Sequence, residues 1–221
     1  MAISRGPKVV TSGLSLYLDA ANSSSYPGSG TTWTDISGNN RNGALTNGPT
    51  FNSSNGGSIV FDGTNDFVSV ASDANILSTT AYTKTVWFYV TSFATDNNLI
   101  SAGSSGQHAL WLFTSNKLNA GHNGNWNTVV STTTLVLNRW YFGSVTFNNT
   151  SGWVLYLNGV QESTSVSTTT FTGTGTISIG SYQNLGNYFT GRIATATVYN
   201  RVLSSSEILQ NYNATKSRFG L

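Results

Sequence analysis

The chain has 221 residues, of which 38% are hydrophobic, 12% aromatic and only 8% charged, and it contains no cysteine. These proportions exclude a disordered chain, which lacks aromatic residues and carries net charge, and a fold held by disulfides or thiolate metal sites. No apolar run reaches the length of about 18 residues that a membrane span needs, so we expect no membrane partner. A domain of this length is typical of one large all-β fold.

The net charge of +2 is unevenly distributed. Residues 1–8 and 201–221 each carry +2, whereas residues 9–200 have five basic and seven acidic residues. Domain termini often lie close together, so the two ends predict one basic docking patch; the alternative is two solvated tails. No central basic cluster supports nucleic-acid binding. The predicted docking residues are Arg5, Lys8, Lys216 and Arg218.

Short segments of alternating apolar and polar residues recur along the chain, and each predicts a strand. Turn-forming pairs separate them, and Asn158-Gly159 predicts a hairpin with a type I′ turn. The Ser/Thr-rich residues 163–174 predict a mixture of loop and polar edge strand. Many short strands with frequent turns predict an all-β antiparallel sandwich or jelly roll. The predicted strands are residues 14–18, 58–61, 67–70, 85–90, 109–113, 140–147, 153–157, 176–179 and 193–199.

One short helix is predicted near the C-terminus. Ser204 and Glu207 have the spacing of a capping box, and the apolar residues Ile208 and Leu209 follow. The N-terminus has neither the apolar stretch nor the cleavage site of a secretory signal. We therefore expect an N-terminal arm (1–12), one β-sandwich (13–213) and a C-terminal tail (214–221).

Several stretches, taken in order, resemble laminin-G-like members of the concanavalin A-like superfamily. Residues 33–40 resemble the family's W-x-D-x-S-G-N loop, and residues 59–68 resemble its F-D-G-x-x-D-Y-V element. Residues 153–159 resemble a strand that ends in L-Y-L-N-G, and residues 191–204 resemble the closing strand and its helix. This resemblance implies a two-sheet antiparallel jelly-roll sandwich with one short C-terminal helix, whose first and last strands are neighbours.

The complete pattern, including the lead R-G-P-K-V-V (residues 5–10) and the end R-F-G-L (residues 218–221), also resembles laminin-G-like structural proteins of tailed, particularly marine, bacteriophages. The resemblance implies a non-catalytic virion surface protein, a capsid decoration or a tail or fibre component, made in the host cytoplasm without a signal peptide. Its partners would be other virion proteins, bound through the termini, and cell-surface polysaccharide. Association of the chain with copies of itself is left as a further alternative. The alternative is a carbohydrate-binding lectin-like module outside a virion, with or without Ca²⁺.

One turn is a candidate calcium site. Asp62, Asn65 and Asp66 bring three oxygen-bearing side chains together, and the resemblance suggests Ca²⁺ at such a rim, with Asp19 or main-chain carbonyls as further ligands. The alternative is a plain turn in which these side chains bond to the backbone.

Two loops are candidates for glycan binding, because each combines an aromatic ring with polar groups. Trp33, Asp35 and Asn39 form the first; alternatively Trp33 plugs the edge of the sandwich and Asp35 caps nearby amides. His122, Asn125 and Trp126 form the second; alternatively its histidine is a plain surface residue.

Catalysis is not expected. Glycoside hydrolysis usually needs two carboxylates across the scissile bond, and related glucanases on this fold carry them in an E-x-D-x-E strand. The chain has no such strand, and its two glutamates are Glu162 and Glu207. It also lacks a cysteine nucleophile and the G-x-S-x-G and H-E-x-x-H motifs.

Overall fold

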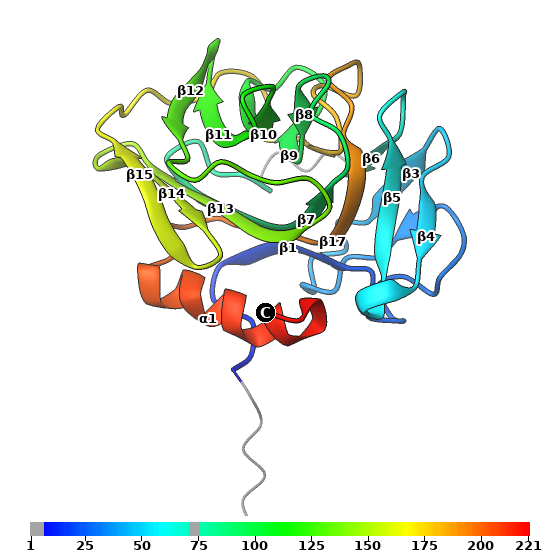
Figure 1. The fold of residues 1–221 in the computed structure, drawn as a ribbon. Helices are drawn as coiled ribbons and strands as arrows, with labels where there is room; N and C mark the ends of the chain where they lie inside the picture. The colour runs from blue at the N-terminus through cyan, green and yellow to red at the C-terminus, as the bar shows by residue number, and fades with distance from the viewer. Residues whose placement is uncertain (1–6, 71–75) are drawn as a thin grey trace, which may run out of the picture.

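The computed structural model describes residues 7–70 and 76–221, and its strands form two opposed layers (Figure 1). The first layer is an antiparallel sheet of eight strands. These are β1 (Leu14–Asp19), β4 (Thr50–Asn52), β5 (Ser58–Asp62), β7 (Ala81–Val90), β13 (Trp140–Asn148), β14 (Gly152–Leu157), β15 (Val160–Ser165) and β17 (Thr190–Tyr199). The order across the sheet is β15-β14-β13-β7-β17-β5-β4, and β1 also pairs with β17. The first and last strands are therefore neighbours, as expected.

The opposite layer consists of two smaller sheets. One has the order β12-β11-β10-β8, and the other has the order β2-β3-β6-β16-β9. The amide of Leu99 donates to the carbonyl of Leu110 at 3.0 Å, which links the two. The strands of the first sheet are β8 (Asn97–Asn98), β10 (His108–Phe113), β11 (Lys117–His122) and β12 (Asn125–Val130). Those of the second are β2 (Thr32–Trp33), β3 (Gly43–Thr46), β6 (Phe67–Val70), β9 (Ile100–Ala102) and β16 (Ile177–Ile179).

The predicted all-β antiparallel sandwich with one C-terminal α-helix is confirmed. The alternation that predicted the strands also explains the core, because successive side chains of a strand point to opposite faces. In β7, Tyr82, Val86 and Phe88 join the main core between the layers, whereas Trp87 belongs to a second apolar cluster. The hairpin between β14 and β15 has positive φ at both Asn158 (51°) and Gly159 (80°), as the predicted type I′ turn requires.

Helix α1 (Ser205–Thr215) covers the second cluster, on the outer face of the eight-stranded sheet. Its capping box is formed as predicted, since the Ser204 side chain accepts from the Glu207 amide and Glu207 accepts from the Ser204 amide. Two 3₁₀ turns, η1 (Ser54–Gly56) and η2 (Lys216–Phe219), complete the described helical elements. No helix in the described ranges is long and apolar enough to cross a membrane.

The C-terminal residues 214–221, which we expected to form a tail, instead pack against the sheet. The Phe219 ring stacks on the Trp87 ring with centroids 4.1 Å apart and is only 8% exposed. The physical reason is that Trp87 points away from the main core, so its outer face needs an apolar cover. The two ends of the described chain also meet: the Val10 amide donates to Asn211 Oδ1 at 2.8 Å.

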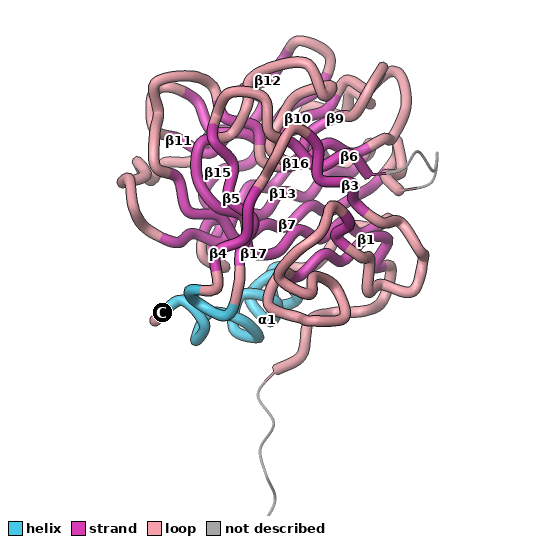
Figure 2. Tube along the Cα trace, turned by 90° about the vertical axis from the view of Figure 1, so that its right-hand side faces the viewer, coloured by secondary structure: helices cyan, strands magenta, loops and turns pink. Residues whose placement is uncertain are grey.

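Helix α1 and the strand β12 lie on opposite sides of the molecule, and Figure 2 shows the same separation after a 90° turn. The fold therefore presents two different faces. One carries the helix and both ends of the described chain, and the other is the outer face of the four-stranded sheet.

Candidate functional site

A pocket opens on the outer face of the four-stranded sheet. Leu110 and Leu112 of β10 belong to the main core, so strand alternation turns Ala109 and Trp111 outward. The pocket has a volume of about 90 Å³. Its lining comes from three strands and two loops: Asp96, Asn98, Ala109, Trp111, Trp126, Tyr182 and Asn187. We refer to it as the Trp126 pocket.

Aromatic side chains form its walls. Trp111 is 6% exposed, and its indole Nε1 donates to the carbonyl of Trp126 at 2.9 Å. The Trp126 ring is half-buried and meets the Tyr182 ring edge to face, with centroids 5.3 Å apart. Beside Trp111, the small Ala109 leaves room for a ligand. The pocket therefore offers aromatic surface to one edge or one substituent of a ligand.

Gly121 of β11 allows Trp126 to lie where it does. The ladder between β11 and β12 shifts register between Ala120 and His122, and the backbone of Asn125 and Trp126 lies directly against Gly121. A Cβ at this position would collide with the Asn125 carbonyl oxygen. The glycine is therefore required by the close approach of the two strands.

Polar groups lie at one side of the pocket. The Asn98 amide donates to the Asn187 carbonyl at 3.1 Å and so ties the loop before β17 to β8. Asp96 is half-buried, and this burial raises the pKa of its carboxyl above the ordinary value, an effect that a backbone hydrogen bond from Thr114 partly offsets. The pocket thus combines one carboxylate with two amides.

A second, shallower hollow of about 430 Å³ lies on the other side of Trp126. The other described residues of its lining are small or neutral and polar: Gly124, Asn125, Asn127, Thr128, Ser165 and Ser167. We call it the Asn125 groove. Trp126 lines both hollows, so pocket and groove adjoin at this residue.

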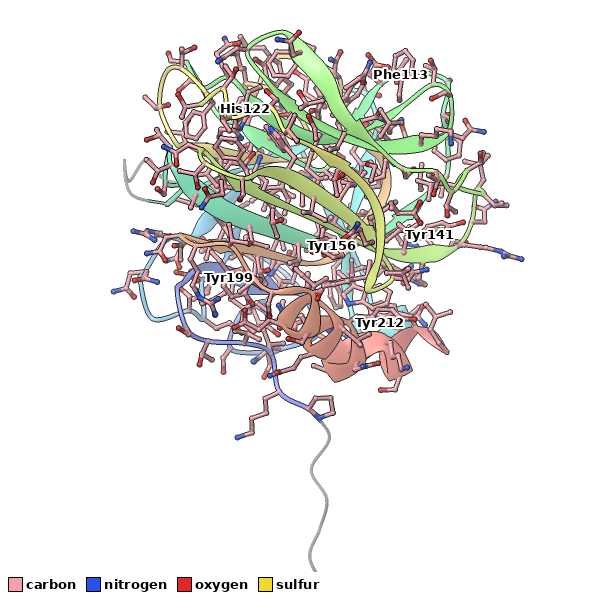
Figure 3. The ribbon with its side chains drawn as sticks, turned by 90° about the vertical axis from the view of Figure 1, so that its left-hand side faces the viewer. Phe113, His122, Tyr141, Tyr156, Tyr199 and Tyr212 are labelled. Carbon is pink, nitrogen blue, oxygen red and sulfur yellow. The ribbon has the colours of Figure 1, made fainter. Side chains whose placement is uncertain are left out.

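Two of the three predicted residues of the second glycan loop, Asn125 and Trp126, line this surface. Its third predicted residue, His122, does not, because it is 3% exposed and lies between the layers. Its Nδ1–H donates to the Thr169 carbonyl at 3.0 Å, and its Nε2 pairs with the Tyr82 hydroxyl at 2.8 Å. Figure 3 shows His122 on the side of the small sheets and Tyr212 on the side of the helix. Both the glycan role and the alternative of a surface histidine therefore need correction.

The first predicted glycan loop also needs correction. Trp33 is fully buried in the main core, so neither face of its ring is available to a sugar. Asp35 is 6% exposed and accepts hydrogen bonds from the amides of Tyr17, Ser37 and Arg41. Asn39 is exposed, but its side-chain amide donates to the Leu14 carbonyl at 3.1 Å. These contacts match the structural alternative.

The predicted calcium residues do not gather at one place. Asp19 forms an ion pair with Arg218 at 2.9 Å. Asp62 Oδ1 accepts from the Thr64 amide, and Asp66 Oδ2 accepts from the Asp62 amide. Asn65 is exposed in the same turn. Within residues 7–70 and 76–221, no group of three or more His, Cys, Asp or Glu side chains is placed to hold a metal ion. A calcium ion in this turn would therefore have two carboxylates, with amide and carbonyl oxygens and water as its other ligands.

The predicted docking residues divide into three groups. Arg5 lies outside the described residues. Lys8 is exposed, and the Lys216 ammonium lies 5.3 Å from the centre of the Tyr212 ring. Arg218 is held by its ion pair with Asp19, so it fastens η2 to β1 and is not a free docking cation. Lys8 and Lys216 remain on the face that carries the helix.

The strand order, the opposed layers and the closing helix define a concanavalin A-like sandwich. Residues 62–209 match the family model Laminin_G_3, described as the concanavalin A-like lectin/glucanases superfamily, and the chain belongs to this superfamily. No curated protein matches its sequence.

Solved structures share the fold at low sequence identity. Trypanosoma rangeli sialidase in complex with sialic acid superposes with a TM-score of 0.70 and 16% identity, over 97% of this chain and 36% of the sialidase. The binding domain of Paraclostridial Mosquitocidal Protein 1 gives a TM-score of 0.70 and 17% identity, over 92% of this chain and 52% of that one. The chain thus spans between a third and about half of the length of these proteins. At this identity, the similarity shows the fold alone.

Proposed function

We propose that the chain is a non-catalytic carbohydrate-binding domain that holds a sugar in the Trp126 pocket and a neighbouring sugar unit in the Asn125 groove. One observation carries the proposal: a half-buried tryptophan lies between an aromatic pocket and a groove lined by amides and hydroxyls. Aromatic rings pack against the apolar faces of sugar rings, and amide and hydroxyl groups hydrogen-bond to sugar hydroxyls. The superfamily, which includes lectins, supports this reading.

We propose a non-catalytic role because of the charged residues that line the pocket. Within the part of the chain that the structure describes, Asp96 is the one carboxylate of its lining. Glycoside hydrolysis usually requires a pair of carboxylates on either side of the scissile bond. Glu162 and Glu207 do not supply the second one: Glu162 accepts hydrogen bonds from Thr132 and Thr133, and Glu207 pairs with Arg201.

A glycan array probed with the labelled protein tests this function. We expect the wild-type protein to bind at least one glycan. The affinity of Trp126→Ala for this glycan should be at least tenfold weaker. The matched control is Trp140→Ala, which removes a half-buried tryptophan from the outer face of the eight-stranded sheet. Circular dichroism of both variants checks that they are folded. Equal loss in the two variants, or no loss in Trp126→Ala, would contradict the proposal.

We also propose that the domain acts on the surface of a phage particle, where the face with the helix is held and the Trp126 pocket faces outward. The resemblance of the chain ends to phage structural proteins motivates the proposal, and the placement of the ends opposite the pocket is consistent with it. Its partners would be capsid or tail proteins of the particle, bound near Lys8 and Lys216, and the domain would be made in the host cytoplasm.

Particles purified from infected cells test the docking. Protein with Lys8→Glu and Lys216→Glu should be absent from particles that incorporate the wild type. Incorporation of the double variant at the wild-type level would exclude this docking surface.

The proposed Ca²⁺ at the Asp62–Asp66 turn has its own test. Bound calcium should raise the melting temperature of the protein, and EDTA should reverse the rise.

A further inference from the structure

The geometry points to a selectivity for uncharged sugars: we propose that the Trp126 pocket takes neutral or N-acetylated hexoses and excludes sugars that carry a carboxylate or a sulfate. This inference rests on the proposed carbohydrate-binding function and specifies the chemical class of its ligand.

The charges of the lining carry the inference. Among the described residues, those that line pocket and groove include one acidic side chain, Asp96, and no lysine or arginine. Every other polar side chain of this described lining is an amide, a hydroxyl or an indole N–H. A carboxylate or sulfate of a ligand would therefore meet a carboxylate and find no cation. Two like charges in a partly desolvated site repel each other more strongly than they do in water.

Three basic residues that lie near the lining in sequence, Lys84, Lys117 and Arg192, make their contacts elsewhere. Lys84 is fully buried between the layers. Lys117 donates from its Nζ to the carbonyls of Ser131 and Thr132 at 2.9 and 2.7 Å. The guanidinium of Arg192 lies over the Tyr89 ring at 3.9 Å, and this ring belongs to the outer face of the eight-stranded sheet. None of these three side chains lines the pocket or the groove.

Asp96 also supplies a positive reason for neutral sugars. An ionised carboxylate accepts hydrogen bonds and donates none, so it matches the hydroxyl groups of a sugar. The Asn98 side chain has little capacity left, because its Oδ1 accepts from the Ser101 hydroxyl at 2.5 Å and its Nδ2 donates to the Asn187 carbonyl at 3.4 Å. Asp96 therefore offers a ligand the charged acceptor of the described lining, beside the side-chain amide of Asn187.

The proposed sugar class differs from the ligand of one structural neighbour. The Trypanosoma rangeli sialidase was solved with sialic acid, an acidic sugar. The matched 36% of that protein and this chain share the fold at 16% identity, which places no ligand in the Trp126 pocket. The charges of this pocket predict a different sugar class.

The test compares pairs of glycans that differ only in an acidic group. One ligand is a neutral oligosaccharide that binds on the array, and the others are its sialylated, sulfated and uronic acid forms. Titration calorimetry should give each acidic form an affinity at least tenfold weaker than that of the neutral form. Equal or tighter binding of the acidic forms would overturn the selectivity and leave the carbohydrate-binding function standing. Binding of no glycan would overturn both.

A charge variant makes the test specific to Asp96. Asp96→Asn keeps the shape of the side chain and removes its charge, so the preference for the neutral glycan should fall by about tenfold or more. Glu162→Gln is the control, because it removes one negative charge outside the lining. An unchanged preference in Asp96→Asn would contradict the assignment.

Salt provides a second readout on the wild-type protein, independent of any variant. The Debye length falls from about 30 Å at 0.01 M salt to about 3 Å at 1 M. The preference for the neutral glycan should therefore narrow as the salt concentration rises. A preference that does not change with salt would contradict a Coulombic origin.

Discussion

The Lys84 Nζ lies 2.8 Å from His108 Nδ1, and both side chains are fully buried between the two layers. Burial lowers the pKa of both groups well below their ordinary values, because desolvation disfavours their charged forms. The same region holds His122, whose pKa burial lowers to about 3, and Tyr82, whose pKa burial raises. Lys84 also donates to the Ile100 carbonyl at 3.1 Å. Burial therefore favours the uncharged form of each group in this polar cluster.

The first prediction concerns the free energy of unfolding between pH 7 and 9. Burial lowers the pKa of Lys84 well below its ordinary value, so over this range the folded chain binds the proton more weakly than the unfolded chain does, and stability rises with pH, by up to about 1.4 kcal/mol per pH unit. Lys84→Met removes this group, and its slope should be smaller by up to that amount. Urea unfolding at each pH measures both slopes. Parallel slopes would mean that Lys84 is charged in the folded protein.

The second prediction concerns His122 between pH 5 and 6.5. The unfolded histidine binds a proton as the pH falls through its ordinary pKa of about 6.5, whereas the folded one stays neutral down to about 3. The contribution of neutral His122 to the free energy of unfolding is therefore fully present above pH 6.5, and it is lost as the pH falls. We expect His122→Gln to reduce the pH slope by up to about 1.4 kcal/mol per unit. The prediction fails if the variant unfolds with the pH dependence of the wild type.

The third prediction concerns the C-terminal residues. Phe219 is 8% exposed and stacks on Trp87, whereas Leu221, two residues further on, is 51% exposed. Phe219→Ala should lower the free energy of unfolding by about 3 kcal/mol, as expected for a buried aromatic residue. Leu221→Ala should change it by less than about 0.5 kcal/mol. Chemical denaturation of both variants checks the difference, and similar values would mean that η2 does not hold Trp87.

Local patterns explain which parts of the fold the sequence predicts. The alternation in residues 85–90 and 193–199 describes strands that are stabilised by burying one face, and the Ser204 and Glu207 capping box lies within four residues of chain. The packing of Phe219 on Trp87 joins residues more than a hundred positions apart. Because such contacts depend on the strand order, sequence alone predicted a tail there.

The pocket was only partly predictable for the same reason. Asn125 and Trp126 stood out as an aromatic residue in a polar loop, but Asp96 and Tyr182 reach the pocket from distant segments. Trp111 did carry a signal, since strand alternation places it on one face with the small Ala109. Applied to residues 81–90, the same alternation places Lys84 on the inward face with Tyr82 and Val86, yet it gives no information about the partner His108.

The most direct test of the proposed sugar site is an NMR titration of the ¹⁵N-labelled protein with a neutral glycan that it binds. The six tryptophan indole N–H resonances are followed as the glycan is added. Trp126 should shift most and Trp111 should follow it, because both line the pocket and are joined by a hydrogen bond. Trp33 and Trp153, which lie fully buried in the main core, should not move, and neither should Trp140 near the C-terminus. Trp126→Phe assigns the key resonance. Shifts confined to Trp140, or binding without any shift at Trp126, would contradict the assignment of the sugar site.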